Sequence, residues 1–190
     1  NSFRRKGVFS RVFGIRRGVN RIDGNVIYSD YQNHDFLRGI VSEDSILIHT
    51  AAYIPKQGKD SSQVEIVNNG IVDFVIQVFK EKKVRKLFNF SSVSIYGYGK
   101  YELINVTEES DVVLINSYSK SKYRSEILFS HSYLNTYNLR VSSPYGRGKS
   151  RKTVLEDIVE KIINGEEIVV YGEGKRSQDF IWVEDISRII

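Results

Sequence analysis

Residues 87–92 read Leu87-Phe-Asn-Phe-Ser-Ser92, a short apolar run that ends in two hydroxyl side chains. The run is typical of a buried strand in an α/β protein. In open α/β sheets, ligands bind in the crevice outside the carboxyl ends of the strands. Ser92 is therefore predicted to lie where a substrate hydroxyl or carbonyl would be held. The alternative is that Ser91 and Ser92 only satisfy backbone groups at the strand end.

Downstream of this strand, Asn116-Ser-Tyr-Ser-Lys-Ser-Lys-Tyr-Arg-Ser-Glu126 contains neither glycine nor proline and is followed by apolar residues, which predicts a helix. Tyr118 and Lys122 are four residues apart, so they lie on one face of that helix. A nearby ammonium favours the phenolate, so we expect Lys122 to lower the pKa of Tyr118. This is the acid/base pair that hydride transfer needs; the alternative is a solvated helix face.

The spacing alone is weak evidence, because short motifs recur by chance. Three further Tyr-x-x-x-Lys pairs each have the sequence Tyr-Gly-x-Gly-Lys: Tyr96/Lys100, Tyr145/Lys149 and Tyr171/Lys175. Two glycines within five residues favour a turn, where the two side chains need not meet. Only the Tyr118/Lys122 pair is predicted to be helical.

Further segments follow the order of one family's motifs. Ser45-Ile-Leu-Ile-His-Thr-Ala-Ala52 is a strand followed by small residues, and Asn68 stands 24 residues before Ser92. Two longer segments lie downstream: Leu139-Arg-Val-Ser-Ser-Pro-Tyr-Gly146 and Gly172-Glu-Gly-Lys-Arg-Ser-Gln-Asp-Phe-Ile-Trp-Val-Glu-Asp185. Together with Ser92 and the Tyr118/Lys122 pair, they resemble the extended short-chain dehydrogenase/reductases, also called the NAD-dependent epimerase/dehydratase family.

The resemblance implies a site for NAD(P). Its cofactor-binding residues would be Asp30, Tyr31, Thr50, Ala51, Ala52, Asn68, Tyr118 and Lys122. Arg16 and Arg17 are predicted to end the second strand of the fold and to belong to this site as well. An acid there would bind the ribose 2′-hydroxyl of NAD, whereas arginine accommodates the 2′-phosphate of NADP. We therefore predict a preference for NADP.

The resemblance also implies the reaction. Ser92, Tyr118 and Lys122 would be catalytic, and a nucleotide sugar would be held by a substrate set: Ser92, Ser143, Arg147, Arg176 and Gln178. Ser143 stands where the family has asparagine, and Gln178 replaces an arginine that meets a nucleotide phosphate. Arg140, Arg147 and Arg176 are candidates for that charge.

Family members that dehydrate nucleotide sugars carry Asp-Glu directly after the Ser/Thr position. Here those positions hold Val93 and Ser94, which supply no carboxylate for eliminating water. The prediction is therefore an NAD(P)-dependent nucleotide-sugar epimerase or 4-ketoreductase rather than a dehydratase. A non-catalytic sensor or scaffold of the same fold is the alternative, but it would not need an acid/base pair. A homodimer is an expectation from the family.

The whole chain alternates between the two kinds of regular structure. Strands are predicted at 11–16, 25–30, 45–51, 86–92, 137–142 and 167–171, and helices near 34–41, 66–83, 117–133 and 153–164. This alternation indicates a parallel sheet covered by helices. An apolar stripe predicts the buried face of the second helix: Ile66, Val67, Ile71, Phe74, Val75 and Val78.

With the resemblance, this organisation is an α/β fold in which residues 1–145 form a Rossmann-like, doubly wound parallel sheet. Residues 146–190 begin a smaller substrate-binding region. The chain contains no methionine and opens in what reads as a helix end at Ser2–Gly7. No glycine-rich turn precedes that helix. We expect an internal fragment that lacks the first strand of the sheet and the end of the substrate domain.

The composition agrees with this interpretation. The 190 residues are 41% hydrophobic, enough for a core, and contain no cysteine and three scattered histidines, so we predict no disulfide and no metal site. No apolar stretch approaches about 18 residues, so we predict a cytoplasmic enzyme without membrane contact. Seven basic residues precede Asp23. They could form a nucleic-acid surface, but we predict no nucleic-acid partner: Arg16 and Arg17 belong to the predicted cofactor site, and a solvated helix end and loop accounts for the others.

Overall fold

The computed structural model describes eleven parts of the chain: 14–17, 21–24, 26–29, 34–54, 62–80, 84–97, 105–132, 135–146, 153–170, 173 and 177–190. The described residues up to Arg140 form one compact unit, and Val141–Ile190 form a second. The domain boundary that we expect after residue 145 stays a prediction.

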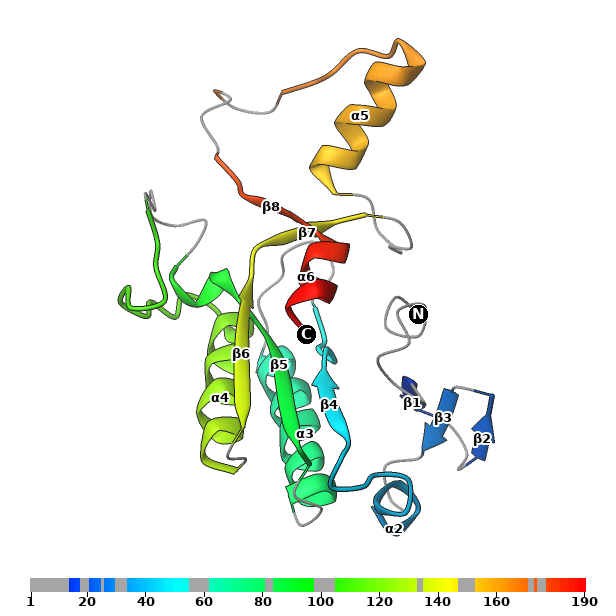
Figure 1. Cartoon of the computed structure of the whole chain (residues 1–190). Coiled ribbons are helices and arrows are strands. Elements are labelled where there is room, and N and C mark those ends of the chain that lie inside the picture. Colours follow the sequence, from blue (N-terminus) through cyan, green and yellow to red (C-terminus); the bar gives the residue numbers. More distant parts are fainter. Residues whose placement is uncertain are drawn as a thin grey trace. The chain divides into compact units, whose positions relative to one another are not determined.

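The first unit alternates strands with helices (Figure 1). Its strands are β1 Gly14–Arg17, β2 Arg21–Asp23, β3 Val26–Ser29, β4 Ile46–His49, β5 Lys86–Ser92 and β6 Thr136–Val141, which ends at the boundary. Its helices are α2 His34–Arg38, α3 Ser62–Phe79, the short 3-10 helix η3 Val93–Ile95 and α4 Ser117–Ser132. The predicted α/β class is confirmed.

The strands form two three-stranded sheets, ordered β1-β3-β2 and β4-β5-β6. β1 is parallel to β3, and β4 is parallel to β5 with His49 opposite Asn89. The short strand β2, which the sequence analysis missed, runs antiparallel to β3. Within the described part of the chain, β3 and β5 are therefore the central strands, and β1, β2, β4 and β6 are edge strands.

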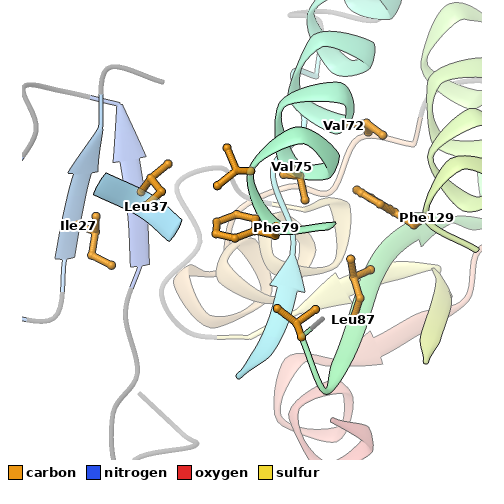
Figure 2. Packing of buried hydrophobic residues seen from close by; sticks show 9 residues of the cluster. Ile27, Leu37, Val72, Val75, Phe79, Leu87 and Phe129 are labelled. Carbon is orange, nitrogen blue, oxygen red and sulfur yellow. The ribbon is translucent and has the colours of Figure 1, made fainter. Parts of the chain in front are cut away.

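The hydrophobic core of this unit gathers around α3 (Figure 2). Val72, Val75 and Phe79 of α3 are buried in a cluster that also contains Leu87 of β5 and Phe129 of α4. Complete burial of each such side chain stabilises the fold by roughly 1.5–3 kcal/mol. This cluster fixes β5 and α4 against α3.

The stripe predicted for α3 is partly wrong. Ile66 and Val67 are exposed, while Val64 and Val72 are buried. The apolar residues of α3 cover a wider arc than the face that contacts α4 and α2, so the pattern did not locate the buried rows. β3, β5, β6 and α4 lie within one residue of their predicted bounds, and β1, β4, α2 and α3 differ by two to four residues.

The second unit holds two short parallel strands, β7 Ser143–Tyr145 and β8 Phe180–Trp182, with helices α5 Val154–Asn164 and α6 Val183–Ile189. Only α5 has the extent predicted for it. The strand predicted at 167–171 is wrong over its described part, because residues 166–170 are irregular. Ile168, Val169 and Val170 are exposed, and a strand needs a hydrogen-bonded neighbour.

The turn after β7 depends on Gly146, whose φ is 141°. A Cβ at this position would lie 2.3 Å from Cγ1 of Val183, so only glycine fits where β7 ends against α6. Helix α5 begins with a capping box: the Thr153 hydroxyl accepts from the Glu156 N–H, and the Glu156 carboxylate accepts from the Thr153 N–H. Among the described residues, no helix has the length and apolar character needed to span a membrane.

Candidate active site

The candidate site is built on β5 and α4, and the start of α4 is set by Asn116. The Asn116 carboxamide oxygen accepts from the Ser119 N–H at 2.8 Å, and the Asn116 N–H donates to the Ser119 hydroxyl at 3.2 Å. These reciprocal bonds satisfy backbone donors that a helix leaves free in its first turn. Tyr118 is therefore held in the first turn of α4.

Three contacts connect α4 to β5 in sequence. Tyr118 shares a hydrogen bond with the Ser92 side chain. The Lys122 ammonium donates to the Phe90 carbonyl at 2.7 Å, and the Asn89 amide donates to the Ser125 hydroxyl at 3.1 Å. The helix therefore runs antiparallel to the strand. Four residues of helix rise about 6 Å, and two residues of strand rise about 6.6 Å. The spacing of Tyr118 and Lys122 along the helix therefore matches the spacing of Ser92 and Phe90 along the strand.

Burial dominates the electrostatics of the pair. Lys122 is 5% exposed, and burial lowers its pKa to about 8. Burial also raises the pKa of Tyr118, and the hydrogen bond with Ser92 acts in the opposite direction. Our expectation that Lys122 lowers this pKa overall is wrong. The ammonium bonds the Phe90 carbonyl and lies 5.8 Å from the centre of the Tyr118 ring, so desolvation of the phenolate prevails.

His49, the last residue of β4, lies close to this pair. It is buried, and its ring packs edge-on against Phe129 at 5.1 Å between ring centres. Burial lowers its pKa to about 4, with the positive charge of Lys122 as the second cause. His49 is therefore neutral near pH 7 and adds no charge to the site.

Asn68 anchors the segment that follows β4. Its carboxamide oxygen accepts from the Tyr53 N–H at 2.6 Å, and its amide donates to the Tyr53 carbonyl at 3.1 Å and the Ser121 hydroxyl at 3.1 Å. The side chain thus links residues 50–54 to α4. That Asn68 also contacts the cofactor stays a prediction, because the hydrogen bonds described for its side chain all go to other residues of the protein.

Other predicted cofactor contacts lie at strand ends. Thr50 and Ala51 are exposed directly after β4, and Ala52 is half-buried. Arg16 and Arg17 are the last two residues of β1, as predicted, with Arg17 opposite Ser29 of β3. Asp30 and Tyr31 lie outside the described residues.

These surroundings fit a dinucleotide. An ammonium carries three N–H donors, and the bond to the Phe90 carbonyl uses one of those on Lys122. The remaining donors suit ribose hydroxyls. The small side chains of Ala51 and Ala52 allow a flat ring to approach the backbone beyond β4.

The predicted substrate residues fall mainly in the second unit. Gln178 donates a hydrogen bond to the Ser143 hydroxyl, beside the pairing of Ser143 with Phe180. Arg147 and Arg176 lie outside the described residues. Arg140 is bound in an ion pair with Glu126 of the first unit, so it is not a free charge for a phosphate.

Two contributors to the site were missed from the sequence: the Phe90 carbonyl that receives Lys122, and the Asn116 cap. A backbone carbonyl has no sequence signal, because every residue carries one. The cap had a signal, since Asn116 precedes a helical run and asparagine is a preferred N-cap residue.

The chain is similar to a known protein family and to several curated proteins. The family described as "NAD dependent epimerase/dehydratase family" matches residues 2–190. A putative UDP-glucose 4-epimerase of Methanocaldococcus jannaschii is 24% identical over 179 residues, which cover 85% of this chain and 56% of that protein. The chain spans about half the length of the curated relatives it matches, from 44% to 56%.

Two solved structures from Bacillus cereus share the fold. The UDP-N-acetylglucosamine 4-epimerase matches with a TM-score of 0.78 at 18% identity, over 98% of this chain and 65% of that one. The UDP-glucuronic acid 4-epimerase, solved with UDP-glucuronic acid and NAD, matches with a TM-score of 0.75 at 16% identity over the same shares. At these identities the likeness concerns the fold.

Proposed function

Because the chain belongs to the NAD dependent epimerase/dehydratase family, we propose that it acts as an NAD(P)-dependent enzyme on nucleotide sugars, as a 4-epimerase or a 4-ketoreductase. The observation that carries the proposal is the contact of Ser92 with Tyr118, beside a buried Lys122 that is anchored on the same strand. A buried ionisable pair next to a hydroxyl at a strand end suits proton transfer.

Each of the three residues has a role in this proposal. The Tyr118 phenol exchanges a proton with the sugar hydroxyl or ketone, and Ser92 hydrogen-bonds the same oxygen, where charge develops. Lys122 offers its remaining donors to the nicotinamide ribose. When bound, the dinucleotide supplies hydride transfer. Because burial raises the pKa of Tyr118, the phenol is protonated near neutral pH and is set to protonate a ketone oxygen.

The residues after Ser92 favour epimerisation or ketone reduction over dehydration. Val93 and Ser94 are the first two residues of η3 and carry no carboxylate that could remove a proton during elimination. A relative of the chain is named a putative UDP-glucose 4-epimerase, which supports a nucleotide sugar as the substrate. A cytoplasmic location and a homodimer belong to the same proposal and rest on the family resemblance.

The decisive variant is Tyr118→Phe, assayed in the full chain with NAD+ or NADP+ and a panel of UDP-sugars. We expect turnover to fall roughly 100- to 10,000-fold, the contribution of a general acid/base, while the dissociation constant of the dinucleotide changes little. The matched control is Tyr123→Phe, the same change on the same helix. Wild-type turnover in Tyr118→Phe would contradict the role of Tyr118 as acid/base. If the wild-type chain binds the dinucleotide but turns over no substrate, a non-catalytic protein would be favoured.

Cofactor choice is a separate proposal. Arg16 and Arg17 at the end of β1 favour NADP, whereas the similar UDP-glucuronic acid 4-epimerase contains NAD. Fluorescence titration of the full chain with NADPH and NADH decides between them. We expect tighter binding of NADPH, with Arg17→Asp reversing the order; equal affinities in the wild type would contradict the preference.

A further inference from the structure

Arg140 of β6 joins three segments of the first unit. Its guanidinium pairs with the Glu126 carboxylate of α4, with Nη2 donating at 2.8 Å and Nε at 3.1 Å. Its Nη1 donates to the Tyr96 hydroxyl at 2.5 Å and to the Glu108 carbonyl at 2.8 Å. One side chain therefore binds the helix, the turn after β5 and the segment that leads to α4.

The two main partners of Arg140 belong to the elements that carry the candidate site. Glu126 follows Lys122 by four residues, as Lys122 follows Tyr118, so all three lie along one face of α4. Tyr96 closes η3, the 3-10 helix whose N-cap is Ser92. The Ser92 hydroxyl accepts from the Ser94 N–H at 3.2 Å, so η3 is held at both ends.

A second contact fixes the same turn. The Val113 N–H donates to the Ile95 carbonyl at 2.7 Å, and Val113 pairs with Tyr96 in an isolated parallel bridge. The chain then enters α4 three residues later, at the Asn116 cap. Tyr96 is thus placed by backbone pairing on one side and by Arg140 on the other.

We propose that Arg140 is a positioning residue, which holds the turn after Ser92 at a set distance from the α4 face that carries Tyr118 and Lys122. The inference rests on the proposed function of these three residues. Arg140 itself does not contact the reacting atoms. It acts through Tyr96 on Ser92 and through Glu126 on the helix.

The arrangement suits this role better than stabilisation alone. Glu126 is 5% exposed and receives two N–H groups of one planar guanidinium, which fixes orientation as well as distance. The Arg140 guanidinium also lies 5.1 Å from the centre of the Tyr96 ring. By comparison, the Arg124–Asp73 pair between α4 and α3 is partly exposed and connects no residue of the candidate site.

The mild test is Tyr96→Phe, which removes one hydroxyl and leaves the Arg140–Glu126 pair intact. We expect kcat of the full chain to fall roughly 3- to 10-fold, the effect of one lost hydrogen bond, with KM nearly unchanged. The matched control is Tyr137→Phe on β6, whose ring stacks on Phe88 and is half exposed. We expect the control to behave as the wild type.

The pH profile separates positioning from general loosening of the fold. The hydrogen bond with Ser92 lowers the pKa of Tyr118, so a displaced Ser92 raises it further. In the oxidative direction, where Tyr118 accepts a proton, the rise of kcat with pH then moves to higher pH in Tyr96→Phe. A smaller folded fraction would leave the midpoint unchanged once kcat is divided by the fraction of folded protein measured at each pH.

A second pair of variants compares two ion pairs of α4. Arg140→Lys keeps a charge for Glu126 but loses the planar fork, so we expect kcat to fall about as far as in Tyr96→Phe, or further. Arg124→Lys is the control and should retain wild-type kcat. Full kcat and an unmoved pH midpoint in both Tyr96→Phe and Arg140→Lys would overturn the positioning role while the proposed function stands. A wild-type chain without dinucleotide-dependent turnover would overturn both.

Discussion

Helices α4 and α5 show opposite relations between sequence and burial. α4 is polar over most of its length, yet it buries five polar residues: Ser119, Ser121, Lys122, Ser125 and Glu126. α5 has a regular apolar stripe, yet none of its residues is buried within the described part of the chain, and Ile163 is 78% exposed. Apolar periodicity therefore shows which face of a helix can be buried, not whether it is.

The polar face of α4 is buried because its groups have partners. Lys122 donates to the Phe90 carbonyl, Glu126 accepts from Arg140, and the Ser125 hydroxyl donates to the Lys122 carbonyl at 2.6 Å. An unpaired polar group in a protein interior costs about 1–3 kcal/mol, and more when it is charged. A polar helix that packs this closely is therefore sustained by specific contacts, which is typical of a functional site.

The largest expected effect concerns the buried carboxylate of α4. Arg140→Met leaves Glu126 unpaired and should lower the free energy of unfolding by roughly 3–5 kcal/mol, measured by urea denaturation. The double variant Arg140→Met/Glu126→Met removes both charges and should recover most of that loss. Equal stabilities of the single and double variants would show that Glu126 is not held in the interior by Arg140.

The next effect concerns His49, which packs against α4. Its pKa is about 4 in the folded protein and about 6.5 when unfolded, so the unfolded chain binds more protons between these values. Stability is therefore lost as the pH falls from 6.5 to 4, by on the order of 3 kcal/mol from this group.

His49→Gln removes this titration. Urea unfolding of the variant and the wild type at pH 7.5 and pH 4 should show a shallower loss of stability in the variant. Parallel curves would mean that His49 is accessible to protons in the folded state.

The smallest effect is expected on α5. Ile163→Gln should change the free energy of unfolding by less than about 0.5 kcal/mol, as for other exposed positions. Ile186→Gln in α6 of the same unit is the matched control, since Ile186 is 5% exposed, and it should cost about 2 kcal/mol or more. If Ile163→Gln cost as much, the apolar stripe of α5 would be covered by something outside the described residues.

Much of the candidate site could be predicted from short-range patterns. The apolar run that ends at Ser92 and the helical run around Tyr118 and Lys122 correctly anticipate β5 and α4. The contact between Ser92 and Tyr118 was not predicted. The strands β2, β7 and β8 were missed, since each has only three residues and depends on a partner strand. Residues 167–170 show the converse, a largely apolar run that has no partner strand among the described residues.

By itself, the sequence determined the α/β class, the helix that carries Tyr118 and Lys122, and the strand that ends at Ser92, because apolar runs and helical spacing are local properties. The tertiary structure decided the ionisation of the site: burial raises the pKa of Tyr118, although a neighbouring lysine alone would lower it. It also decided that Arg140 serves Glu126 and Tyr96 rather than a phosphate. Desolvation and ion pairing depend on which segments, distant in sequence, come into contact. The spacing of residues along the chain does not predict those contacts.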